Sequence, residues 1–134
     1  MQYWLCKTEP SVYPFEQLEA DHETRWDGVR NATALIHIRA MAVGDQVVIY
    51  HSGDVRSAVG LAEVITAPHA DPEADNPRWA VVDVRVGKRL EPPVSLGYLK
   101  ELPEFAESPL VRISRLSVLP LTVEQFRIIT AVRG

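Results

Sequence analysis

The stretch that decides the fold is Gln46-Val47-Val48-Ile49-Tyr50-His51-Ser52, which has apolar side chains at successive positions. In an extended chain Val47 and Ile49 lie on one face. Val48 and Tyr50 lie on the opposite face. A strand that is apolar on both faces lies in the middle of a sheet and is covered on two sides. Residues 46–52 therefore predict a central strand.

Further strands are predicted around this one. Residues 53–57 are typical of a hairpin loop, after which residues 58–66 return as the second strand. On that strand Gly60 and Ala62 share one face, which leaves room for a bulky group nearby. The remaining strands are expected at residues 3–7 and 79–88.

Helices are predicted on either side of the strands. Asn31 suits the N-cap of a helix that runs to about residue 41, with an apolar stripe of Ala34, Leu35, Ile38 and Met41. Thr122 and Gln125 form a capping box that opens the last helix, which carries Phe126, Ile129 and Val132. Shorter helices are expected at 14–20 and 95–102, an irregular segment at 21–30 and an extended one at 110–119. Because adjacent strands outnumber helices, the sequence predicts an α+β fold, a mixed sheet or small barrel surrounded by helices.

The composition limits the class of protein. The 134 residues, 46% of them hydrophobic, suit one domain with a packed core. No apolar run approaches the roughly 18 residues of a membrane span, and the opening residues lack the pattern of an export signal. A single cysteine excludes an internal disulfide and fits a reducing compartment. We therefore expect one cytoplasmic domain over residues 1–134, with no membrane partner.

The net charge is small, and arginine far outnumbers lysine among the basic residues. A net charge of −4 argues against a protein that coats duplex nucleic acid by bulk electrostatics. Eleven of the 14 basic residues are arginine, the residue that stacks on flat rings and binds phosphate or carboxylate in a fork. The excess of arginine indicates either local contacts with anions or bases, or simply the GC content of the genome.

Catalytic and metal-binding patterns are weak. The single cysteine and the four histidines never pair at metal-ligand spacing, and no phosphate-binding glycine loop is present, so neither a metal nor a cofactor is expected. His51 and Ser52 are neighbours on a strand and point to opposite faces, so His51 is poorly placed to activate Ser52. Cys6 is expected to be a buried strand residue.

One set of residues suits a flat heteroaromatic ligand. Trp26 lies in a polar stretch and offers a ring for stacking. Partners in the plane of the ligand are available from Thr8, Ser52 and the backbone of Val29 or Asn31. An anion would meet Lys7, Arg30 and the N–H groups at the start of the following helix.

Each of these residues also has a purely structural alternative. Trp26 is equally well suited to cap the core, and Asn31 to cap a helix. The structural alternative for Arg30 is an ion pair with a carboxylate, and the alternative for Lys7 is an ion pair with Glu9. The remaining structural expectations are a satisfied, half-buried His51 and core or rim packing for Trp4 and Trp79.

Seven motifs in register resemble the EVE domain family, whose eukaryotic relatives form the thymocyte nuclear protein group. They are Tyr3-Trp4-Leu5-x-Lys7-Thr8-Glu9-Pro10, Trp26-x-Gly28-Val29-Arg30-Asn31, Met41-x-Val43-Gly44-Asp45, Tyr50-His51-Ser52, Gly60-x-Ala62-Glu63-Val64, Pro77-Arg78-Trp79 and Arg115-Leu116-Ser117-Val118-x-Pro120. The resemblance implies a PUA-like fold, a mixed barrel-like sheet with helices around it. This fold is similar in architecture to that of YTH domains, which hold a methylated RNA base in an aromatic pocket.

The resemblance also implies a base-binding site and no established catalysis. By this resemblance Trp26 is the pocket tryptophan, Val29, Arg30 and Asn31 form its edge, and Lys7 and Ser52 face the same cavity. The segment that closes the cavity is Arg115, Leu116, Ser117 and Val118. Thr8 and Cys6 stand where the family usually has serine and leucine, and the connection at 71–77 is shorter than in many members.

We therefore hypothesise a non-enzymatic module that takes a single, modified base of DNA or RNA into a pocket around Trp26. Base stacking contributes about 1–3 kcal/mol and extrusion of a base from a duplex costs a similar amount, so single-stranded targets are favoured. Two alternatives remain. One is an enzyme that acts on a small nucleotide-like molecule with His51 or Glu9 as general base, and the other is a plain protein-interaction module.

Overall fold

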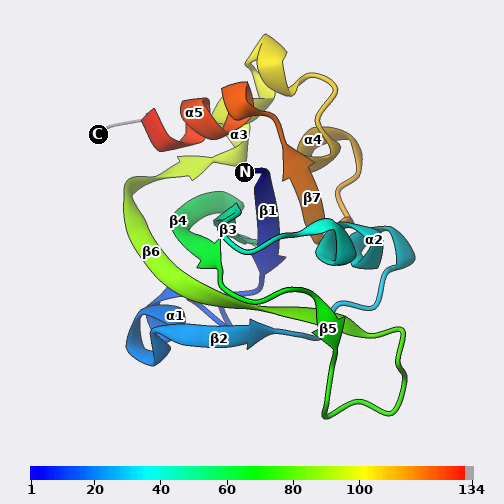
Figure 1. Cartoon of the computed structure of the whole chain (residues 1–134). Coiled ribbons are helices and arrows are strands. Elements are labelled where there is room, and N and C mark those ends of the chain that lie inside the picture. Colours follow the sequence, from blue (N-terminus) through cyan, green and yellow to red (C-terminus); the bar gives the residue numbers. More distant parts are fainter. Residues whose placement is uncertain (132–134) are drawn as a thin grey trace.

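One mixed sheet organises the molecule. The structure is a computed structural model that describes residues 1–131, in which seven strands are hydrogen-bonded in the order β2-β6-β4-β3-β1-β7, with β5 beside β6. Their bounds are β1 Tyr3–Thr8, β2 Glu23–Trp26, β3 Gln46–His51, β4 Ser57–Val64, β5 His69–Ala70, β6 Ala80–Ser95 and β7 Val118–Leu121. β1 and β3 are parallel, and the other pairs are antiparallel. The long β6 curves around the sheet and gives it a barrel-like shape (Figure 1).

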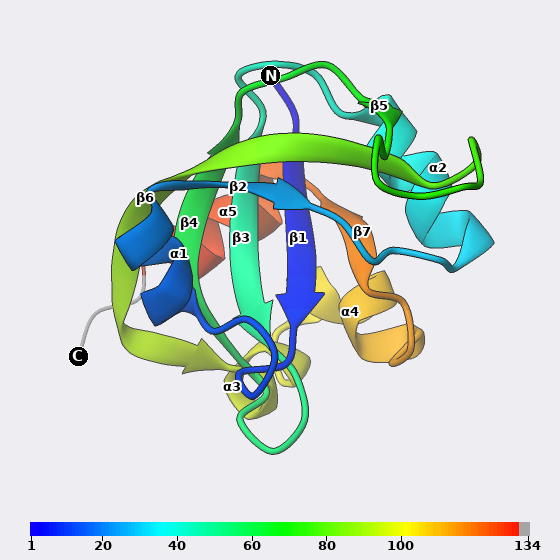
Figure 2. The same cartoon turned by 90° about the horizontal axis from the view of Figure 1, so that it is seen from below.

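Helices surround this sheet, so the predicted α+β class is confirmed. They are α1 Phe15–Asp21, α2 Ala32–Ala40, α3 Leu96–Lys100, the 3-10 turn η1 Pro103–Phe105, α4 Pro109–Arg112 and α5 Val123–Ala131. α1 lies beside β2, and α2 lies at the other end of β2, near β5 (Figure 2). Among residues 1–131, no helix has the length and apolar character needed to cross a membrane.

The predicted central strand is confirmed. β3 lies between β1 and β4, and five of its six residues are buried. The hairpin to β4 is also present, with Gln46 opposite Glu63 and His51 opposite Ser57. Burial on both faces explains why residues 47–50 of this strand are all apolar.

The bulky neighbour predicted for Gly60 is Phe15. The ring of Phe15, the first residue of α1, lies directly over Gly60, so that a Cβ built there would be 2.2 Å from its Cζ atom. Phe15 is 1% exposed, and its backbone N–H donates a 3.0 Å hydrogen bond to Nε2 of His51. The missing side chain in β4 therefore sets where α1 begins.

Local capping signals in the sequence are confirmed. Oδ1 of Asn31 accepts a 3.0 Å hydrogen bond from the N–H of Ala34 at the start of α2. The capping box of α5 is reciprocal: the N–H of Gln125 donates to Thr122 Oγ1, and the N–H of Thr122 donates to Gln125 Oε1. Val132, predicted on the apolar stripe of the last helix, lies outside the described residues.

Three boundaries differ from the prediction. Residues 21–30 were expected to be irregular, but β2 forms there because Glu23–Trp26 pairs with β6, a contact distant in sequence. Residues 110–119 were expected to be extended, but Ser108 caps α4 with Pro109 at its first position, and the chain becomes extended only in β7. The strand predicted at 79–88 continues as β6 to Ser95, where it pairs with Ser57.

Candidate functional site

A cavity opens beside Trp26, at the end of β2. It has a volume of about 530 Å³, within the range of small-ligand sites. Its walls come from the end of β1, the turn before α1, strand β2 and the segment that leaves β2. The lining residues are Thr8, Val12, Tyr13, Thr24, Arg25, Trp26, Asp27 and Gly28.

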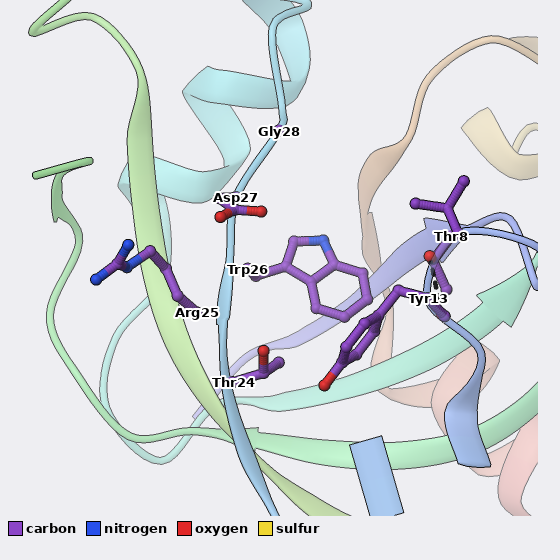
Figure 3. Close-up of a pocket in the computed structure, with 8 residues that line it drawn as sticks. Thr8, Tyr13, Thr24, Arg25, Trp26, Asp27 and Gly28 are labelled. Carbon is purple, nitrogen blue, oxygen red and sulfur yellow. Dashed lines mark hydrogen bonds between the residues drawn. The ribbon is translucent and has the colours of Figure 1, made fainter. Parts of the chain in front are cut away.

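Two aromatic rings shape this cavity, which we call the Trp26 cavity. Figure 3 shows the rings of Trp26 and Tyr13 next to each other in its lining, with their centroids 6.4 Å apart and their planes at 89°, an edge-on arrangement. Trp26 is 8% exposed, so its indole is packed into the core on one side while it lines the cavity on the other. An indole wall with a phenol edge at right angles to it suits a planar, apolar-faced ligand.

The alternation of side chains along β2 decides which residues face the cavity. Thr24 and Trp26 point to the same side, and Arg25 points to the opposite side (Figure 3). Nη1 of Arg25 lies 3.1 Å from the Glu73 carboxylate and 3.6 Å from that of Asp71. These ion pairs fasten the edge strand β2 to the connection that follows β5.

Hydroxyl groups supply the polar part of the cavity. The Thr8 hydroxyl donates a 3.0 Å hydrogen bond to the carbonyl of Tyr13, which leaves its oxygen able to accept one from a ligand. The Tyr13 hydroxyl donates at 2.7 Å to the carboxylate of Asp21. Burial raises the pKa of Tyr13, so the phenol stays neutral at physiological pH, while the hydrogen bond from Tyr13 lowers the pKa of Asp21.

Of the residues predicted for the site, the structure places Trp26 and Thr8 together in this cavity. Val29 is buried at 6% exposure, just past the rim. Asn31 caps α2, as its structural alternative predicted. Arg30 lines a separate hollow, where its guanidinium lies 4.5 Å from the ring centroid of Trp79.

Lys7 and Ser52 line another hollow, of about 240 Å³, together with Arg56. The Lys7 ammonium donates at 2.9 Å to the carbonyl of Ser114 and lies 5.7 Å from the ring centroid of Tyr50. Burial lowers the pKa of Lys7. Neighbouring residues of β1 point to opposite faces, which places Lys7 and Thr8 in different hollows.

The Nε2 atom of His51 accepts the hydrogen bond from the Phe15 N–H, so the prediction of a satisfied histidine is confirmed, but the residue is buried and not half-buried. Burial lowers its pKa, which favours the neutral ring. His51 is not among the residues that line the Trp26 cavity, and neither is Glu9. Within residues 1–131 no three His, Cys, Asp or Glu side chains are close enough to hold a metal ion.

The segment predicted to close the cavity lies on the other side of β1. Leu116 and Val118 are buried in the core, whereas Arg115 is exposed. The carbonyl of Ser117 accepts a 2.8 Å hydrogen bond from the N–H of Lys7. These four residues are not part of the lining of the Trp26 cavity.

The prediction from sequence missed Tyr13 and Thr24, which complete the cavity. A signal for Thr24 was present, because a β-branched residue two positions before Trp26 indicates a strand with both side chains on one face. Tyr13 had no comparable local signal. It reaches Trp26 only because Phe15 seats the start of α1 against β4.

Seven strands surrounded by helices, with a partly aromatic cavity at the end of an edge strand, define a small α+β domain. The EVE domain matches residues 2–132, and the chain belongs to this family. The family membership inferred from the seven motifs is thereby confirmed.

Relatives and solved structures agree with this assignment. Thymocyte nuclear protein 1 of Rattus norvegicus is 33% identical over 164 aligned positions, which cover 97% of this chain and 73% of that protein. The solution structure of Rpa0253 from Rhodopseudomonas palustris is 38% identical, with a TM-score of 0.91 over 98% of this chain and 92% of that one. Human THYN1 protein, solved in complex with DNA containing 5-methylcytosine, is 28% identical, with a TM-score of 0.81 over 98% of this chain and 96% of that one.

Proposed function

We propose that this chain is a non-catalytic nucleic-acid-binding module that holds a modified base of DNA, with 5-methylcytosine as the first candidate, in the Trp26 cavity. The observation that carries the proposal is the cavity itself: about 530 Å³, with an indole on one wall and a phenol edge at right angles to it. The human relative in complex with DNA containing 5-methylcytosine supports the choice of ligand.

The forces available in the cavity match a flipped base. Stacking on an aromatic ring contributes about 1–3 kcal/mol per base, and each CH₂-sized apolar group that is buried adds about 0.8 kcal/mol. A methyl group on the base therefore increases affinity about 4-fold through burial alone. Since extrusion from a duplex costs a few kcal/mol, a single strand binds more tightly than a duplex of the same sequence.

A binding role also fits the state of the residues once considered for catalysis. His51, the candidate general base, is buried and already accepts the hydrogen bond from the Phe15 N–H. The hydroxyls of Thr8 and Tyr13, in contrast, are suited to orient a ligand by hydrogen bonding.

The test is an equilibrium titration of fluorescently labelled single strands that differ only in one methyl group on cytosine, with RNA of the same sequence as a second arm. The wild type is expected to prefer the methylated DNA strand. Trp26→Ala removes the stacking surface and is expected to weaken binding about 5- to 150-fold. Equal binding of methylated and unmethylated strands would contradict the choice of 5-methylcytosine.

Because the Trp26 ring is only 8% exposed, its truncation also costs about 3–5 kcal/mol of folding free energy. A second variant avoids this difficulty. Val12 lines the cavity and is 77% exposed, so Val12→Trp fills the entrance without disturbing the core. Val12→Trp is expected to lose binding, whereas the control Val12→Ser keeps it. Unchanged binding by a folded Val12→Trp protein would show that the base lies elsewhere.

A further inference from the structure

A second hollow, of about 270 Å³, lies between α2 and the start of β6. Its lining combines three arginines and one tryptophan with the apolar residues Ala32, Leu35 and Ile36. We call this set the arginine groove and define it as Arg30, Arg39, Arg78 and Trp79. The three arginines are exposed, and Trp79 is half-buried.

The arginine groove concentrates cations that lack carboxylate partners. The ion pairs found among residues 1–131 join Arg25, Arg85, Arg89 and Arg112 to carboxylates, and none of them involves an arginine of the groove. A guanidinium stays charged at all physiological pH values. In a chain with a net charge of −4, the groove thus gathers three cations whose charge is not neutralised by an ion pair within residues 1–131.

Two of the guanidinium groups are held in place. That of Arg30 stacks over Trp79, with 4.5 Å between its carbon and the ring centroid, and its Nη1 donates at 3.1 Å to the carbonyl of Val29. Nη2 of Arg39 donates at 2.6 Å to the carbonyl of Arg78. These contacts restrict the side chains and leave most N–H donors of each guanidinium for a ligand. Pre-oriented forks of this kind match the geometry of phosphate oxygens.

The arginine groove and the Trp26 cavity are close to each other along the chain. Gly28 lines the cavity, and Arg30 follows two residues later, a distance of at most about 7 Å along the chain. Figure 2 shows β2 leading through this short segment into α2. Phosphates along one strand of a duplex are about 3.4 Å apart in axial rise, so the groove is within reach of the nucleotides next to a base in the cavity.

We propose that the arginine groove binds backbone phosphates of the nucleic-acid strand beside the base held in the Trp26 cavity. The proposal rests on the proposed function and extends it: the cavity selects the base, and the groove fixes the register and direction of the strand. An acidic peptide would also present anions, but the position of the groove next to a base-sized cavity favours a polynucleotide.

The test measures how binding depends on salt. A single-stranded oligonucleotide with one 5-methylcytosine is titrated at several salt concentrations against the wild type and the double variant Arg39→Gln/Arg78→Gln. Each lost phosphate contact lowers the slope of log affinity against log salt by about 0.7, so the double variant should lose about 1.4. Both side chains are exposed, so the thermal unfolding midpoint should stay unchanged.

Arg127→Gln is the matched control. Arg127 is an exposed arginine on α5, with no ion pair recorded among residues 1–131, and α5 lies on the side of the sheet away from β2 (Figure 1). Its removal changes the net charge by the same amount per residue and should leave the slope unaltered. Free 5-methylcytidine, which has no phosphate, should bind the wild type and the double variant equally.

The outcomes separate this inference from the proposed function. If the wild type binds the oligonucleotide and the double variant shows the same slope, the inference is wrong and the proposed function stands. If the double variant loses affinity for the free nucleoside as well, the arginines support the cavity and not the backbone, which also overturns the inference. A polyglutamate peptide that binds the groove as tightly as the oligonucleotide would assign it to acidic proteins. No binding of any strand by the wild type would remove both proposals.

Discussion

Replacing Gly60 with alanine tests how the wall of the Trp26 cavity is held in place. A Cβ at this position would lie 2.2 Å, 2.3 Å and 2.7 Å from the Cζ, Cε1 and Cδ1 atoms of Phe15. Carbon atoms in contact normally keep about 3.5–4.0 Å, so the ring must move by more than 1 Å or the strand must shift. Phe15 is 1% exposed, and the guanidinium carbon of Arg89 lies 5.4 Å from its ring centroid.

The size of the effect follows from two opposing contributions. Overpacking of a filled core costs about 1–3 kcal/mol, and removal of a glycine from a strand returns about 0.5–1 kcal/mol. Because backbone atoms of β4 and a fully buried ring are involved, we place the net loss at about 2 kcal/mol. In a domain of this size that lowers the melting temperature by about 6–10 °C. Phe15 follows Tyr13-Pro14 directly, so displacement of its ring should also weaken base binding.

The assay is urea denaturation followed by tryptophan fluorescence, with Gly97→Ala as the matched control. A Cβ at Gly97, in α3, would meet only Ser95 Oγ at 3.9 Å, so this variant should equal or exceed the wild type in stability. Phe15→Ala makes room for the new methyl group, and the double variant should be more stable than the sum of the two single losses predicts. A Gly60→Ala protein as stable as Gly97→Ala would refute the reasoning.

Three further predictions concern buried polar and ionisable groups. Asp45 accepts hydrogen bonds from Trp4 Nε1 and two backbone N–H groups, and these lower its pKa against the opposing effect of burial. Asp45→Asn should therefore reduce the free energy of unfolding by about 1–3 kcal/mol at pH 7. In denaturant titrations, the difference in stability between wild type and variant should shrink below about pH 4, as the carboxyl group is protonated. Burial lowers the pKa of His51, so the unfolded chain binds a proton more readily than the folded one. The free energy of unfolding should therefore fall as the pH drops through about 6.5. His51→Gln should show a shallower fall in the same denaturant titrations. Burial raises the pKa of the Cys6 thiol to about 12, so a thiol reagent at pH 8 should label the denatured protein and leave the native protein unlabelled.

Features set by neighbours along the chain were predictable from the sequence. Asn31 and the Thr122–Gln125 pair form hydrogen bonds between a side chain and the backbone three residues away. Their residue types therefore predict where the helices begin. The burial of β3 was readable for a similar reason, because consecutive apolar residues leave an extended chain no solvent face. Ser108-Pro109 is the same kind of local signal and marks the start of α4, although residues 110–119 were predicted to be extended.

The candidate site was only partly predictable. Trp26 stood out because no apolar periodicity surrounds it, and Thr8 because it ends the first strand. Lys7 and Ser52 were grouped with them by their chemistry and again by the family resemblance. They line a separate hollow, because neighbouring residues of β1 point to opposite faces.

Taken alone, the order of residues determined the family, the α+β class, the central strand and the caps, because each depends on local periodicity or on a motif only a few residues long. Tertiary structure decided that Tyr13 faces Trp26, that β2 forms at all, and that Arg30, Arg39 and Arg78 share one groove. These features join segments up to 62 residues apart, from Glu23 to its partner Arg85. Their energy comes from packing and pairing between distant parts of the chain, and no short stretch of sequence carries that information.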